Sequence, residues 1–223
     1  MRARIEAACE RVGRAPDGVR IVAVTKGRSP DEVRTLLAAG QRTLGENRVQ
    51  DWRAMADALA DSAPRWHLVG HLQRNKVRFC RPFELIHSLD SERLALALEA
   101  EGAKHGHVFR TLLQVNVAGE ESKHGVTANA AAALLVRLRA LEHVTVEGLM
   151  TMAPFADDPE RARERARPVF RDTRMLAETL GLRELSMGMS GDFEVAVEEG
   201  ATLVRVGSAL FEHDAPGDGG SEA

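Results

Sequence analysis

A lysine follows a short apolar run near the start of the chain, and this placement suits covalent chemistry. Residues 20–25 read RIVAVT, and Lys26 comes directly after them. If this run is a buried strand, apolar neighbours wall the stem of Lys26, and desolvation lowers the pKa of its amine. Such an amine is a competent Schiff-base nucleophile. The alternative is a lysine that simply reaches from a strand end into solvent.

Two similar turns near the other end of the chain suit a phosphate group. Residues 187–192 read MGMSGD and residues 205–208 read RVGS, so each apolar run ends in small residues that open a helix. Helix N-termini offer free N–H groups to anions, and glycine lets the backbone approach closely. Ser190, Gly191, Gly207 and Ser208 are therefore candidate phosphate ligands. The alternative is two well-capped helix starts.

A lysine for an aldehyde and two turns for a phosphate together suggest pyridoxal 5′-phosphate (PLP). Lys26 would hold the aldehyde as an aldimine, and the turns would hold the phosphate. Arg205 precedes the second turn and would face the pyridine ring from an inward position on its strand. An arginine near the ring nitrogen keeps that nitrogen unprotonated and weakens the cofactor as an electron sink.

The elements that must position these residues alternate along the whole chain. We expect strands at residues 20–25, 42–45, 66–69, 84–89, 110–117, 144–150, 184–189 and 203–206. Helix-patterned segments separate them, including residues 46–60 and 159–180, and an amphipathic helix over residues 1–14 comes first. Ser29, followed by proline and two acids, is typical of a helix start.

Strand–helix alternation without hairpin turns predicts a parallel sheet, and this number of units fits a single (β/α)8 TIM barrel. A doubly wound open sheet is the rival architecture. We expect one barrel domain over residues 1–212 and a flexible tail at residues 213–223, which are Gly-rich and acidic. In a barrel, the candidate residues lie together at the carboxyl ends of the strands.

The composition excludes several classes of function. The 223 residues carry 30 Lys+Arg and 33 Asp+Glu, for a net charge of −3, which argues against general nucleic-acid binding. No apolar run is long enough to span a membrane, and residues 1–14 do not read as a signal peptide. The two cysteines, Cys9 and Cys80, fit a reducing compartment, so we expect a cytoplasmic protein.

Two catalytic motifs are approached but not met. His67 and His71 have the spacing of a zinc-protease helix, but the glutamate is missing and the segment reads as strand plus turn, so we expect no metal site. Residues 188–192 read GMSGD and miss the hydrolase pattern GxSxG, because Asp192 stands where the second glycine belongs.

Seven longer stretches cover nearly the whole chain. They are VAVTK at 22–26, AAGQRTLGENRVQD at 38–51, WHLVGHLQRNK at 66–76, IHSLDS at 86–91, LLQVNVAGEESKHG at 112–125, GLMTMAP at 148–154 and LSMGMSGDFEVAVEEGATLVRVGSALF at 185–211. Together they resemble the pyridoxal phosphate homeostasis protein family. The resemblance implies a barrel of the alanine-racemase N-terminal-domain type (PLP fold type III). It also implies a set of cofactor-binding residues: Lys26 as the aldimine lysine, Asn47 beside the cofactor, Arg205 at the ring nitrogen, and Ser190, Gly191, Gly207 and Ser208 at the phosphate.

The same resemblance implies a carrier, buffer or regulator of intracellular PLP rather than a catalyst. A fold-type-III racemase or decarboxylase is one alternative, and another phosphate-handling barrel that uses Lys26 is a second. The racemases add a second domain and rely on tyrosines, whereas this chain has no tyrosine. We therefore expect a PLP-binding monomer without catalytic residues, with apo PLP-dependent enzymes as candidate recipients.

Overall fold

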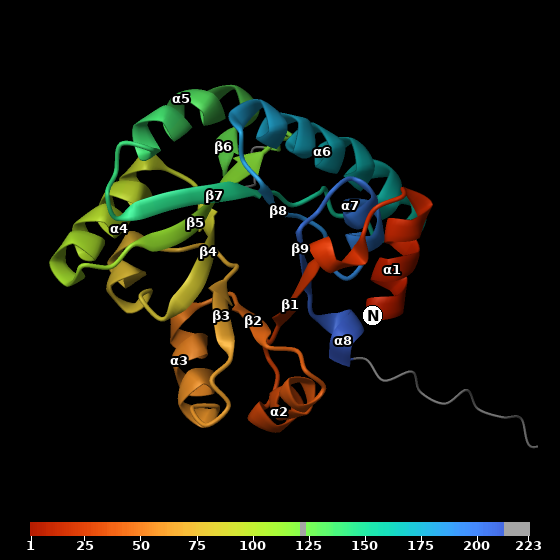
Figure 1. Cartoon of the computed structure of the whole chain (residues 1–223), viewed down its shortest axis with the longest axis horizontal. Coiled ribbons are helices and arrows are strands. Elements are labelled where there is room, and N and C mark those ends of the chain that lie inside the picture. The colour runs from red at the N-terminus through yellow and green to blue at the C-terminus, as the bar shows by residue number, and fades with distance from the viewer. Residues whose placement is uncertain (121–123, 212–223) are drawn as a thin grey trace, which may run out of the picture.

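Eight parallel strands close into a barrel in the computed structural model, which describes residues 1–120 and 124–211 (Figure 1). They are β1 (Arg20–Val24), β2 (Thr43–Glu46), β3 (Arg65–Leu68), β4 (Phe83–Leu89), β5 (Phe109–Asn116), β7 (Val144–Met150), β8 (Glu184–Ser186) and β9 (Leu203–Val206). Because β4 pairs with β5 and β1 pairs with β9, the sheet has no open edge. The predicted barrel is confirmed, and the doubly wound sheet is excluded.

Helices cover the outside of this barrel (Figure 1). They are α1 (Arg2–Arg11), α2 (Pro30–Ala38), α3 (Val49–Ala58), α4 (Glu92–His105), α5 (Ala128–Leu138), α6 (Pro159–Leu180), α7 (Phe193–Glu198) and α8 (Ser208–Phe211), with 3₁₀ turns at Pro16–Gly18 and Arg74–Phe79. The predicted start of α2 is confirmed. The hydroxyl of Ser29 accepts from the Glu32 N–H at 3.3 Å, and the Glu32 carboxylate accepts from the Ser29 N–H at 2.8 Å.

Two departures from the expected elements matter for the site. The helix expected from residue 46 begins at Val49, because Glu46 still belongs to β2. A two-residue strand, β6 (Val126–Thr127), pairs with β5 and was not expected, since two residues are too few to show a periodicity. The expected tail at residues 213–223 lies outside the described residues. Within the described part of the chain, no helix is both long and apolar enough to cross a membrane.

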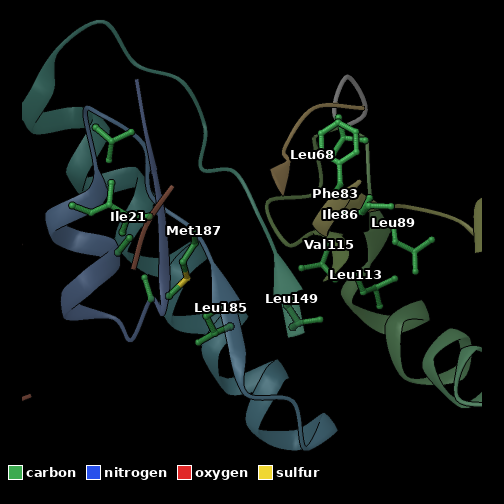
Figure 2. Packing of buried hydrophobic residues seen from close by; sticks show 14 of the residues in the cluster. Ile21, Leu68, Phe83, Ile86, Leu89, Leu113, Val115, Leu149, Leu185 and Met187 are labelled. Carbon is green, nitrogen blue, oxygen red and sulfur yellow. The ribbon is translucent and has the colours of Figure 1, made fainter. Parts of the chain in front are cut away.

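The strands bury side chains on both faces. On β1, Ile21 and Ala23 join the large cluster between barrel and helices, of which Figure 2 shows a part. Val22 points the other way and belongs to a small cluster of interior side chains with Leu85, Leu112, Met150 and Leu203. Alternate residues of a strand face opposite sides of its sheet. Because β1 ends at Val24, this alternation does not extend to Lys26.

The amino ends of six strands carry charged residues that pair around the bottom of the barrel. They are Arg20, Arg65, Glu84, Arg110, Glu147 and Glu184. Arg110 of β5 contacts Glu84 of β4 at 3.7 Å and donates to Glu147 of β7 at 2.9 Å. Arg20 of β1 pairs with Glu184 of β8. We call this set the charged ring. These partly exposed pairs each contribute at most about 1 kcal/mol. They connect β3, β4, β5 and β7 in one group and β1 and β8 in another.

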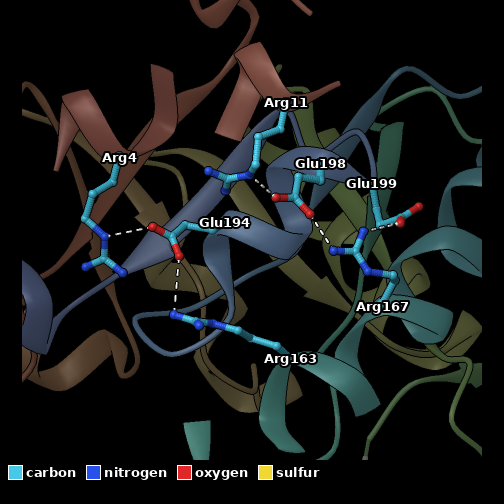
Figure 3. Close-up of polar contacts among 7 residues, drawn as sticks. All are labelled: Arg4, Arg11, Arg163, Arg167, Glu194, Glu198 and Glu199. Carbon is cyan, nitrogen blue, oxygen red and sulfur yellow. Dashed lines mark hydrogen bonds and ion pairs between the residues drawn. The ribbon is translucent and has the colours of Figure 1, made fainter. Parts of the chain in front are cut away.

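A second set of ion pairs fixes α1 to the barrel (Figure 3). Arg4 and Arg11 of α1 bind Glu194 and Glu198 of α7 at 3.0 and 2.6 Å. From the other side, α6 supplies two further arginines to the same carboxylates: Arg163 and Arg167. Arg163 and Arg167 of α6 are therefore engaged within the molecule.

Candidate functional site

A cavity of about 560 Å³ opens at the carboxyl ends of the strands, where barrel enzymes and binding proteins place their ligands. Its lining includes six of the seven site residues that the sequence predicts: Asn47, Ser190, Gly191, Arg205, Gly207 and Ser208. Methionines line other parts of the cavity: Met150, Met152 and Met189. The cavity thus combines polar groups on the turns with apolar walls.

The two predicted phosphate turns contact each other directly. The hydroxyl oxygen of Ser190, in the turn after β8, accepts from the N–H groups of Gly207 and Ala209 at 3.3 and 3.4 Å. Asp192 orders its own turn, because its carboxylate accepts from the Met189 N–H at 2.6 Å. Segments that the sequence presents separately therefore form one polar rim.

Open space surrounds the two glycines of this rim. A Cβ atom at Gly191 would meet no atom within 4 Å, and at Gly207 the nearest atom, the carbonyl oxygen of Val24, would lie 3.5 Å away. Neither glycine is required by packing against the protein. The bare backbone leaves room for a ligand group, which fits the predicted role.

Arg205 lies at the base of the cavity, with only 5% of its surface exposed. It donates through Nη1 to the backbone oxygen and the hydroxyl of Ser186, at 2.8 and 2.7 Å, and through Nη2 to the Thr151 oxygen at 2.9 Å. Burial lowers the pKa of Arg205 to about 10, so the guanidinium stays cationic at neutral pH. The predicted inward position of Arg205 is confirmed.

Lys26 is placed differently from the prediction. Its side chain is exposed and lines a neighbouring cavity, which shares Asn47, Gly70 and His71 with the first. The reason is local: β1 ends at Val24, and the Arg28 N–H bonds to the Thr25 oxygen at 3.0 Å. This turn begins before Lys26 can continue the strand. Lys26 is therefore exposed, and apolar neighbours do not enclose its side chain as the sequence predicted.

A buried acid next to this turn escaped the sequence analysis. Glu46 ends β2 with 2% of its surface exposed, and its carboxylate accepts a hydrogen bond from the fully buried Thr25 hydroxyl. Burial raises the pKa of Glu46, although the bond from Thr25 opposes this effect. The sequence reads Glu46 as a helix start, and nothing in its spacing signals a partner on the neighbouring strand.

Two buried histidines lie below the cavity. His67 of β3 and His87 of β4 approach through Nδ1 and Nε2, respectively, at 2.9 Å, and Nδ1 of His87 lies 2.8 Å from the Ser186 hydroxyl. Burial lowers the pKa of His67 to about 3 and that of His87 well below its ordinary value. Both imidazoles are therefore neutral at pH 7. Sequence analysis singled out His67 only for its spacing from His71.

His71 belongs to a different level of the barrel. It lies at the mouth, where its Nδ1 is 3.3 Å from the Asp90 carboxylate and its ring stacks on His124 at 4.3 Å between centroids. The two rings are nearly parallel, with 14° between their planes. His71, Asp90 and His124 each bring one nitrogen or oxygen atom within 4.8 Å of the others, whereas His67 is buried, so the motif HxxxH is divided between the interior and the mouth.

Comparison with known proteins identifies the fold and the family. The family model for the alanine racemase N-terminal domain matches residues 1–214. A protein of Deinococcus radiodurans named pyridoxal phosphate homeostasis protein is 46% identical over 210 residues, covering 94% of this chain and 96% of that protein. One of the same name from Aquifex aeolicus is 41% identical over 215 residues, covering 93% and 92%.

Solved structures agree with these matches. PipY of Synechococcus elongatus, in a structure described as having PLP bound, superposes with a TM-score of 0.81 at 36% identity, covering 94% of this chain and all of that one. An alanine racemase of Clostridium difficile shares the fold alone, with a TM-score of 0.71 at 16% identity, and this chain covers 56% of it. By sequence and by structure, this chain belongs to the pyridoxal phosphate homeostasis protein family, built on the alanine-racemase N-terminal-domain barrel.

Proposed function

We propose that this chain binds PLP in the cavity at the carboxyl ends of the strands and acts in PLP homeostasis. The observation that carries the proposal is the joining of the Ser190 and Gly207 turns on one rim of a cavity whose base holds Arg205. This arrangement suits a flat aromatic ligand with a phosphate at one end. The names of the relatives and the PLP-bound PipY structure point to the same ligand.

The phosphate would bind at the rim. Ser190 already accepts from two backbone N–H groups, so its own hydrogen remains for donation to a phosphate oxygen. Ser208 adds a second hydroxyl, and Gly191 and Gly207 allow the close approach. Asn47 lies in the wall that separates this cavity from Lys26 and would contact the cofactor from that side.

Arg205 would face the pyridine nitrogen. A guanidinium donates hydrogen bonds and accepts none, so the ring nitrogen opposite it must be the acceptor and carry no proton. When bound, PLP supplies an electron-withdrawing ring, and an unprotonated nitrogen reduces that property. Arg205 therefore favours retention of the cofactor over strong carbanion chemistry.

Lys26 would form the covalent link to the aldehyde carbon of PLP. Its four-carbon stem is flexible, and its cavity adjoins that of the phosphate rim. Binding of the aldehyde would draw the amine across the wall formed by Asn47 and Gly70.

We further propose that the chain is a carrier or buffer rather than a catalyst. The racemases of this fold use tyrosine as an acid–base group, and this chain has none. Apo PLP-dependent enzymes of the cytoplasm would be its recipients, and a monomer suffices because all proposed ligands come from one barrel.

The purified chain with bound PLP should show a visible absorption band, and borohydride should fix the cofactor to Lys26. K26A should lose the band, whereas K76A should retain it, because Lys76 lines the same neighbouring cavity as Lys26. A band that persists in K26A, or reduction that labels Lys76, would overturn the assignment. Sustained turnover of D- or L-alanine, serine or lysine at ordinary enzyme rates would overturn the carrier role.

A further inference from the structure

Arg205 is connected to a chain of buried polar side chains that descends through the barrel. We infer that Ser186, His87 and His67 are positioning residues that hold the Arg205 guanidinium against the ring nitrogen of bound PLP. This inference rests on the proposed PLP site. The hydrogen-bonded series of side chains from Arg205 to His67 belongs to the protein itself and does not depend on that proposal.

The chain crosses the interior of the barrel. His87 lies on β4 and Ser186 on β8, and these strands are not neighbours in the sheet. The contact of 2.8 Å between His87 Nδ1 and Ser186 Oγ therefore spans the interior rather than a strand pair. His67, His87 and Ser186 are all buried, with 3%, 0% and 0% of their surfaces exposed. Such a contact has no solvent to replace it.

Only one arrangement of donors and acceptors satisfies the hydrogen bonds that run from Arg205 to His67. Arg205 only donates, so Ser186 Oγ accepts from Nη1 at 2.7 Å. Among the described residues, the only further partner of this hydroxyl is His87 Nδ1, so Ser186 donates its hydrogen there. His87 must then carry its proton on Nε2.

The same reasoning continues to the last member of the chain. His87 Nε2–H points to His67 Nδ1 at 2.9 Å, which makes that nitrogen an acceptor. His67 must therefore carry its proton on Nε2 as well. The chain requires two neutral imidazoles of one tautomer, and burial favours the neutral forms of both.

These hydrogen bonds hold the guanidinium of Arg205, which is the group that would contact the cofactor. Nη1 has two acceptors, both on Ser186, and Nη2 has the Thr151 oxygen. Without the Ser186 hydroxyl, Nη1 keeps only a backbone oxygen, and the guanidinium gains freedom to turn away from the ring nitrogen. His87 acts one step further away, by orienting that hydroxyl, and His67 acts one step beyond.

If these three side chains only filled the barrel, replacing them would change the stability of the protein. It would not change the release of PLP or its absorption spectrum. The matched control is Thr111, a fully buried threonine of β5 whose hydroxyl donates to the Thr145 oxygen at 2.9 Å. Its neighbour Leu112 faces the interior, so Thr111 faces the helices. T111V thus removes a buried hydroxyl away from Arg205.

The experiment compares S186A, S186T, H87Q, H67Q and T111V with the unchanged chain, each loaded with PLP. Release of PLP is followed by activation of a PLP-dependent apo-enzyme, and the absorption spectrum and thermal unfolding of each variant are recorded. S186A should release PLP about tenfold faster, as expected for one hydrogen bond to a charged group. H87Q and H67Q should show progressively smaller effects, S186T should restore retention, and T111V should stay within about twofold of the parent.

Equal release from S186A and T111V would overturn the inference, as would a spectrum unchanged in S186A. Failure of the unchanged chain to bind PLP would instead refute the proposed function. If S186A does not fold, ¹⁵N NMR of the histidine-labelled chain still tests the arrangement in the unchanged protein. Both buried imidazoles should be neutral Nε2–H tautomers at pH 7. An Nδ1–H tautomer of His87 would refute the proposed arrangement of hydrogen bonds.

Discussion

The hydroxyl oxygen of Ser190 accepts from the N–H of Gly207 at 3.3 Å and so joins the turn after β8 to the turn after β9. One side chain therefore organises both halves of the proposed phosphate site. Its effect on binding should depend on whether the ligand carries a phosphate.

Ser190→Ala should weaken PLP binding about tenfold or more, because a hydrogen bond to a charged group contributes about 1.5–3 kcal/mol. Pyridoxal, which lacks the phosphate, should bind S190A and the unchanged chain equally well. Equilibrium titrations of both ligands measure the difference, with Ser62→Ala, an exchange outside the cavity, as the control. A parallel loss of pyridoxal affinity would contradict the phosphate role.

Gly191→Ala should separate binding from stability. No protein atom lies within 4 Å of the added methyl group, so the unfolding free energy of the PLP-free chain should change by less than about 0.5 kcal/mol. PLP affinity should fall, because the methyl group occupies space beside the bare backbone of the rim.

Gly148→Ala is the matched opposite. Its Cβ would lie 1.9 Å from the carbonyl oxygen of Glu184, so β7 and β8 must move apart. We expect a loss of about 1–3 kcal/mol in denaturant unfolding. A G148A chain as stable as G191A would show that the close contact of these strands is relieved at no cost.

Stability should fall as the pH drops below about 6.5, the ordinary pKa of histidine. The folded chain holds His67 neutral down to a pKa of about 3 and His87 to a value well below the ordinary one, while the unfolded chain binds both protons. Depressed pKa values in the folded state mean stability that is present above pH 6.5 and lost on acidification. Each histidine should contribute a slope of about 1.4 kcal/mol per pH unit.

Chemical denaturation between pH 6.5 and pH 5 measures this slope above the range in which ordinary carboxylates titrate. Glu46 acts in the opposite direction above its ordinary range, because burial raises its pKa in the folded chain, and the comparison with H67Q separates the histidine contribution from this effect. H67Q should lose about half of the slope. A slope unchanged in H67Q would show that other groups cause the acid sensitivity.

Arg167→Ala tests the attachment of α6 to α7. Arg167 bonds to Glu199 at 2.9 Å and pairs with Glu198, whose side chain is only 11% exposed. We expect a loss of about 1 kcal/mol that shrinks at high salt. Arg165→Ala is the control, since Arg165 is exposed and has no ion pair among the described residues. Equal effects of the two changes would exclude a specific role for the network.

Much of the architecture could be predicted because the strands and helices of the barrel depend on local sequence patterns. The strand runs at residues 144–150 and 203–206 and the cap at Ser29 each depend on near neighbours, and the structure has them where the sequence indicates. The polar rim could also be anticipated, because parallel strands bring the ends of β8 and β9 to one edge.

The missed features depend on contacts between strands or on a turn. Glu46 meets Thr25 from the neighbouring strand, and His87 meets Ser186 from across the barrel, at sequence separations of 21 and 99 residues. The helix and strand periodicities of a sequence do not indicate such distant pairs. Lys26 was predicted to be enclosed by apolar neighbours because it follows an apolar run. The strand instead ends at Val24, and the Arg28 N–H bonds to the Thr25 oxygen in a turn that leaves Lys26 exposed.

The charged ring and the filled interior affect how ligand and water reach the cavity. Below the cavity, the barrel is occupied by fully buried side chains such as Leu112 and Leu203, and beneath them the charged ring joins the strands. A ligand at Arg205 therefore has buried side chains below it and the cavity mouth above it. Water and ligand therefore share the mouth of this cavity. A molecule that covered this mouth would shield the bound ligand from solvent.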